Sequence, residues 1–135
     1  MRLIKMLFGF THQKKKKGTV DYNAHKMRRK YPLNERGYFG EKGRSKRKPG
    51  QKQVVRVIES ENQYKTAKDF YSKISKGGKE SPLPNSQGKR KDLLDKTTIV
   101  YREKTSTPSS PAVSLNTPKN SKVESQKIHF EKKQK

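Results

Sequence analysis

Two short stretches in the C-terminal part of the chain alternate apolar and polar residues, and they restrict what the chain can fold into. They are residues 97–102 (TTIVYR) and residues 126–130 (QKIHF). Both are rich in β-branched and aromatic residues, which is typical of β-strands. Because successive side chains of a strand point to opposite faces, Ile128 lies on one face and Lys127 and His129 lie on the other. The pattern predicts a sheet with one face in a core and one polar face.

Three more elements follow from hydrophobic periodicity. Residues 54–58 (VVRVI) and residues 111–116 (PAVSLN) predict two further strands. Between them, a capping box with Ser60 as the N-cap and Gln63 as its partner predicts the start of a helix, and Gly77 predicts its end. The apolar face of this helix repeats at helical spacing. It consists of Ala67, Phe70, Tyr71 and Ile74.

This order of elements predicts an α+β fold with one main helix packed on a small antiparallel sheet. Hydrophobic residues make up only 27% of the 135 residues, too few for a core along the whole chain. Residues 1–52 hold 17 Lys/Arg against three Asp/Glu, whereas the rest hold 18 against nine. We therefore predict a basic, largely irregular and flexible arm over residues 1–50, an α+β domain over residues 51–131, and a tail over residues 132–135.

The charge balance indicates the partner. A formal net charge of +23 favours a polyanion, most simply RNA or DNA, whose counterions are released on binding. The chain has no cysteine and no apolar run of the roughly 20 residues that a membrane span needs. The apolar start, residues 1–10, is short and is interrupted by Lys5, so no signal peptide is expected. We expect a monomer.

Five blocks, in this order, resemble the C-terminal toxin domains of polymorphic bacterial toxins, which Gram-positive secreted toxins and contact-dependent inhibition proteins carry. The blocks are residues 66–71 (TAKDFY), 75–80 (SKGGKE), 98–103 (TIVYRE), 110–113 (SPAV) and 126–130 (QKIHF). Residues 34–40 (NERGYFG) are similar to the connector that precedes such domains. The chain departs from the expected pattern at Lys96, where a glycine would follow Asp95, and at Thr117, where an apolar residue would continue the strand.

The resemblance implies a small metal-independent ribonuclease of the barnase, EndoU, colicin and RelE group. It also implies RNA as substrate, a small acidic immunity protein as partner, and action in the cytoplasm, either of the producing cell or of a target cell after secretion.

Metal-free RNA cleavage needs a proton acceptor or donor near neutral pH and cations for the phosphate. His129 fits the first need, and Arg102 and Lys127 fit the second if their strands are neighbours. The expected substrate-binding residues are Tyr101, Thr105 and Ser106. No His/Asp/Glu group has metal-ligand spacing, so neither a metal nor another cofactor is predicted.

Two other interpretations stay open. Composition alone favours a non-catalytic, ribosome-associated RNA-binding protein, because the chain is small and rich in lysine. The chain is alternatively a toxin remnant that no longer cleaves RNA. The feature that favours catalysis is a histidine on a strand beside arginine and lysine, which simple RNA binding does not need.

Overall fold

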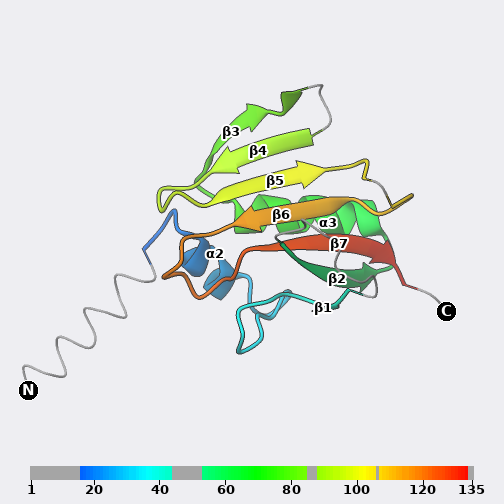
Figure 1. The fold of residues 1–135 in the computed structure, drawn as a ribbon, viewed down its shortest axis with the longest axis horizontal. Helices are drawn as coiled ribbons and strands as arrows, with labels where there is room; N and C mark the ends of the chain where they lie inside the picture. Colours follow the sequence, from blue (N-terminus) through cyan, green and yellow to red (C-terminus); the bar gives the residue numbers. More distant parts are fainter. Residues whose placement is uncertain (1–15, 44–52, 85–87, 106, 134–135) are drawn as a thin grey trace, which may run out of the picture.

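The computed structural model describes residues 16–43, 53–84, 88–105 and 107–133 (Figure 1). The fold is α+β, with two helices and seven strands among these residues. The elements are α2 (Val20–Lys26), β1 (Glu41–Lys42), β2 (Val54–Ser60), α3 (Gln63–Ile74), β3 (Lys79–Pro82), β4 (Gly88–Asp92), β5 (Thr98–Arg102), β6 (Ala112–Asn116) and β7 (Gln126–Lys132). No helix in the described ranges is long and apolar enough to cross a membrane.

The seven strands form one sheet in the order β1-β2-β7-β6-β5-β4-β3. All neighbours are antiparallel except β2 and β7, which run parallel with Val54 opposite Gln126. The prediction of a small, purely antiparallel sheet is therefore wrong in size and in one pairing. The pattern missed β3 and β4 because this hairpin is mostly charged and exposed, so it is held by backbone hydrogen bonds rather than by an apolar face.

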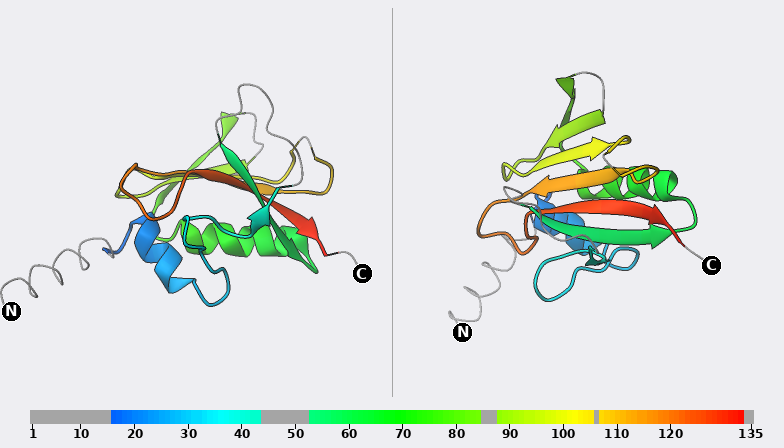
Figure 2. Two further views of the ribbon diagram at one scale, coloured as in Figure 1. Left: turned by 60° about the horizontal axis from the view of Figure 1, so that its bottom comes forward. Right: turned by 45° about the vertical axis from the view of Figure 1, so that its right-hand side comes forward.

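Both helices lie on the same side of the sheet, and the core fills the space between the layers (Figure 2). The predicted apolar face of α3 is confirmed, because Ala67, Phe70, Tyr71 and Ile74 are all buried. Phe70 is central to the core. Its ring centroid lies 5.1 Å from that of Tyr31, 5.0 Å from that of Phe39 and 5.5 Å from that of Phe130.

The predicted start of this helix is wrong by two residues. Ser60 is the last residue of β2, and Asn62 is the N-cap, with its side chain accepting a hydrogen bond from the Lys65 amide at 3.2 Å. Because both Ser60 and Asn62 are good capping residues, only the end of the strand decides between them. The predicted glycine stop is confirmed, since Gly77 has a φ of 86° just after the helix.

The predicted irregular arm is wrong for residues 16–43. This segment contains α2, and five of its apolar residues belong to the buried core. They are Val20, Ala24, Met27, Tyr31 and Phe39. The first three follow helical spacing. The sequence prediction missed them because it considered the overall charge of the segment, and six lysines and arginines lie between residues 16 and 30. Residues 1–15 and the predicted domain boundary near residue 50 lie outside the described ranges.

Helix α2 is joined by polar contacts to three other parts of the fold. Asn23 donates to the carbonyl of Ile74 at 2.7 Å, at the C-terminal end of α3. Asp21 accepts from the Ser121 hydroxyl at 2.6 Å, in the loop between β6 and β7. Asp95, in the turn after β4, accepts from the first amide of α2 at 3.0 Å. Each contact satisfies a group that α2 or its neighbour would otherwise bury or leave without a partner.

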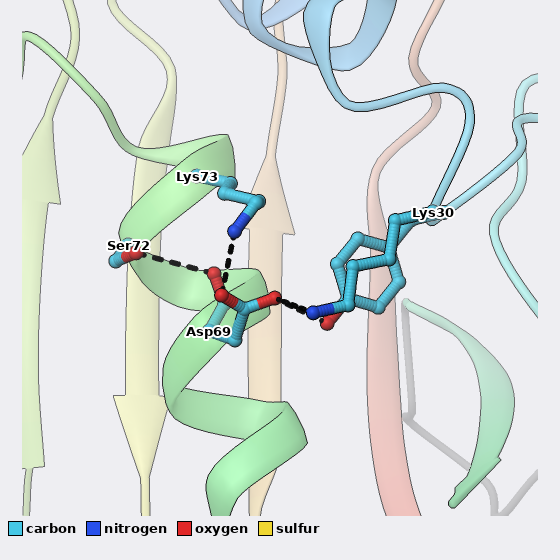
Figure 3. A network of polar contacts seen from close by, with 5 residues as sticks. Lys30, Asp69, Ser72 and Lys73 are labelled. Carbon is cyan, nitrogen blue, oxygen red and sulfur yellow. Dashed lines mark hydrogen bonds and ion pairs between the residues drawn. The ribbon is translucent and has the colours of Figure 1, made fainter.

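Asp69 of α3 forms a fourth connection to the N-terminal segment (Figure 3). Its carboxylate lies 2.9 Å from Lys30 Nζ and 2.6 Å from Lys73 Nζ, and it accepts a hydrogen bond from the Tyr31 hydroxyl at 2.7 Å. Burial acts to raise the pKa of Asp69, but the hydrogen bonds from Lys73, Lys30 and Tyr31 outweigh it and hold this pKa well below its usual range. Asp69 is therefore ionised at neutral pH, and its one negative charge is shared between the two lysines.

We predict that Phe39→Ala lowers the free energy of unfolding by about 3–5 kcal/mol, as for other large core residues. Phe39 is fully buried against Phe70, so the change leaves a cavity between the N-terminal segment and the core. Leu94→Ala is the control, because Leu94 is 75% exposed, and we expect at most about 1 kcal/mol there. Urea titration measures both; equal losses would show that residues 16–43 are not part of the cooperative unit.

We also predict that Lys96→Gly stabilises the fold by about 0.5–1 kcal/mol. Lys96 has a φ of 73°, which lies in the left-handed region that favours glycine. Lys89→Gly, on strand β4, removes the same charge at a site without positive φ and should destabilise instead. Thermal unfolding of the two variants therefore gives shifts of opposite sign; a loss of stability in Lys96→Gly would contradict the argument.

Candidate functional site

The sheet face away from the helices, here called the open face, brings three predicted site residues together. Residues paired across strands point to the same face, and the register aligns Arg102, Ala112, His129 and Val57 in one row over β5, β6, β7 and β2. Lys127 lies on the same face, two residues from His129. The condition set for this site, that the strands of Arg102 and His129 are neighbours, is not met, because β6 lies between them. Their Cα atoms are therefore about 10 Å apart, two strand spacings.

The loop between β5 and β6 holds the His129 ring in place. The Nδ1 atom of His129 lies 3.0 Å from the hydroxyl of Ser110, a residue that is only 2% exposed. Thr105 donates to the carbonyl of Ser110 at 2.7 Å, and Gln63 of α3 donates to the carbonyl of Ser109 at 3.1 Å. The loop is thus fixed from both sides, and the imidazole has one ring nitrogen engaged.

The surroundings of His129 favour its neutral form. Burial lowers its pKa below the ordinary value of 6.5, and the positive charge of Lys127 lowers it further. Hydrogen bonding with Ser110 and the carboxylate of Glu131 act in the opposite direction without reversing the shift. At pH 7 the ring is therefore largely neutral and able to accept a proton.

The structure does not place every predicted site residue on the open face. Tyr101 faces the helices, is 5% exposed, and its ring centroid lies 5.6 Å from that of Tyr71. Burial, with the charge of Glu103, raises the pKa of Tyr101 to about 12. Its assignment to substrate binding is therefore wrong: the alternation that puts Arg102 on the open face puts Tyr101 in the core. Ser106 lies outside the described residues.

The hydroxyl of Thr105 has partners inside its own loop. It donates to the Ser110 carbonyl, lies 3.1 Å from the carbonyl of Thr107 and accepts from the Thr107 amide at 3.2 Å. These contacts stabilise the conformation of the loop that holds Ser110 against His129. The structure thus gives no support for Thr105 as a phosphate ligand.

Sequence reasoning missed two carboxylates beside His129. Strand β7 continues to Lys132, one residue past the predicted end of the domain, so Glu131 lies on the open face about 7 Å along the strand from His129. Glu59 of β2 is paired directly with Glu131. The alternation of Lys127, His129 and Glu131 was the available signal. Within the described ranges, no three His, Cys, Asp or Glu side chains group closely enough to hold a metal ion.

No protein-family model, curated protein or solved structure matches this chain. The similarity to toxin domains and the ribonuclease activity that it implies therefore stay hypotheses, and any argument for function depends on the geometry of the open face.

We predict that Lys127→Gln raises the pKa of His129, measured by NMR titration of its ring protons. A cation next to the ring disfavours imidazolium, so removing it must shift the titration to higher pH. Lys132→Gln on the same strand is the matched control, because Lys132 lies at a position of the opposite face. A wild-type pKa above 6.5, or equal shifts in the two variants, would contradict this account of the site.

Proposed function

We propose that this chain is a metal-independent ribonuclease module of the toxin type, which binds RNA on the open face and cleaves it with His129. The observation that supports this most directly is the row formed by Arg102, Ala112 and His129. This row presents the exposed guanidinium of Arg102 and the neutral imidazole of His129 on one face, on either side of the small side chain of Ala112. A phosphate bound between the two would contact both.

In the proposed reaction the neutral imidazole of His129 accepts the proton of the ribose 2′-OH. The 2′ oxygen then forms a bond to phosphorus, the bond from phosphorus to the 5′ oxygen breaks, and the leaving oxygen takes a proton from solvent. The products are a 2′,3′-cyclic phosphate and a 5′-OH. Arg102 stabilises the charge that develops on the phosphate oxygens, with a geometry suited to bidentate contact, and Lys127 contributes a point charge.

The large positive charge supports RNA as the bound polymer. Phosphate contacts release counterions, so affinity should fall steeply as salt is added. The same surface suits a small acidic immunity protein, which would bind by charge complementarity and cover the open face.

A non-catalytic RNA-binding protein is the second candidate. One observation favours it: burial and the contact with Ser110 leave less of the His129 ring accessible than at a fully exposed position. Under this interpretation Arg102 and Lys127 bind phosphate, and His129 is part of the support of the loop.

We predict that His129→Gln lowers the rate of RNA cleavage by roughly 10²–10⁴-fold, because proton transfer is lost. The RNA affinity should stay within about twofold, since a neutral ring contributes little charge. His25→Gln is the matched control and should cleave at the wild-type rate. The assay uses end-labelled RNA in EDTA, with the cyclic phosphate product scored directly.

Arg102→Gln should differ from His129→Gln. It should weaken RNA affinity as well as cleavage, because Arg102 contacts the phosphate. Cleavage by His129→Gln at the wild-type rate would remove His129 from the mechanism. Clean RNA binding without cleavage by the wild-type protein would favour the non-catalytic protein or an inactive remnant.

A further inference from the structure

A cleft of about 540 Å³ lies between α2 and the C-terminal end of α3, on the helix side of the molecule. It is therefore separate from the open face, which is on the other side of the sheet (Figure 2). Four lysines and one tyrosine line it, together with the buried Asn23. They are Lys17, Tyr22, Lys26, Lys73 and Lys76.

The backbone geometry brings these lysines together. Tyr22 and Lys26 are four residues apart on α2 and so lie on the same side of that helix. Lys73 is in the last turn of α3, and Lys76 follows the helix end. Asn23 donates from one side-chain amide to the carbonyls of Ile74 at 2.7 Å and Lys76 at 3.1 Å, which fixes α2 against the end of α3. The cleft is therefore preorganised rather than formed by mobile side chains alone.

The charge in the cleft is largely uncompensated. Lys73 pairs with Asp69 at 2.6 Å. Lys17, Lys26 and Lys76 have no carboxylate within ion-pair distance in the part of the chain that the structure describes. Three lysines that line one concave surface without acidic partners make it electropositive, and a bound anion would be attracted to it.

Tyr22 adds an aromatic surface to this positive site. Its ring is half-buried, and Lys26 Nζ lies 5.6 Å from the ring centroid. Cations next to an aromatic ring are the combination by which proteins hold single-stranded nucleic acid, because phosphate contacts the cations and a base stacks on the ring. The volume suits one nucleotide and is within the range of small-ligand sites.

We propose that this cleft binds single-stranded RNA, with phosphate groups at Lys17, Lys26 and Lys76 and a base on Tyr22. It is a second contact for the polymer, and it does not depend on cleavage by His129. An RNA strand long enough to pass around the sheet edge would touch both sites, whereas a dinucleotide would reach only one.

The test measures binding of a 2′-O-methyl single-stranded RNA, which cannot be cleaved through its 2′ oxygen, by fluorescence anisotropy over a series of salt concentrations. The variant is Lys26→Gln with Lys76→Gln. The matched control is Lys89→Gln with Lys119→Gln, two exposed lysines outside the cleft. Because the cleft variant removes two cations that bind phosphate, its slope of log K against log salt should fall by about 1.4. The control slope should change by much less, and equal changes in both would overturn the proposal.

Tyr22→Leu tests the stacking. It should weaken binding of the RNA about tenfold and leave binding of inorganic polyphosphate, which has no bases, within about twofold. Equal loss for both probes would reduce the site to a generic anion site and contradict the proposal. Thermal unfolding of each variant shows whether the fold is kept; if Tyr22→Leu is unfolded, Tyr22→Phe with the same probes takes its place and should retain RNA binding.

Two further measurements separate this inference from its alternatives. Cleavage of a dinucleotide should be unaffected by the cleft variant, because the dinucleotide is held at the open face alone. If the wild-type protein shows no cleavage, the anisotropy results still decide the inference. Loss of binding to vesicles of anionic lipid, with RNA binding unchanged, would identify the cleft as a membrane contact and overturn the proposal.

Discussion

Two buried carboxamide side chains hold the basic N-terminal segment onto the rest of the fold. Gln126, on the core face of β7, accepts from the Phe39 amide at 2.8 Å and donates to the carbonyl of Gly37 at 3.0 Å. Asn23 of α2 donates two hydrogen bonds, to the carbonyls of Ile74 and Lys76 at the end of α3. A carboxamide can satisfy backbone acceptors, and in Gln126 also a backbone donor, without carrying charge, so each can be buried at low cost. Removing either would leave backbone groups unpaired inside the core and would release Phe39 or α2 from it.

Much of the second half of the fold could be predicted from the sequence, because there the apolar pattern is regular. The alternation in β5, β6 and β7 and the apolar face of α3 are each carried by side chains that the structure buries. The N-terminal segment could not be predicted in this way. Its apolar residues are few and stand among lysines and arginines, and its attachment depends on Gln126, a polar residue whose partners are 87 and 89 positions away in the chain. Only tertiary structure reveals such contacts.

The candidate site was likewise predictable only in part from the local sequence. Alternation places Lys127 and His129 on one face and Ile128 on the other, and this prediction is confirmed. The distance from Arg102 to His129 depends on strand order, which no local pattern contains. The contact of Ser110 with His129 depends on the path of a loop, and that path is set by Thr105 within the loop and by Gln63 of α3. Local sequence therefore identifies residue types and faces, while topology determines which of them meet.

The parallel pairing of β2 with β7 has a consequence for how the chain folds during synthesis. Strand β7 is made after every other described element, yet it lies between β2 and β6. The two parts of the sheet therefore stay unjoined until β7 has been made. A nascent chain that lacks it exposes two unpaired strand edges, and the pairing spans more than 70 residues, which is slow to form. Such a chain also lacks His129, the imidazole in the row of Arg102 and Ala112. An unfinished copy would therefore be prone to aggregation, and it would lack the imidazole of the candidate site until synthesis of the described part of the chain is nearly complete.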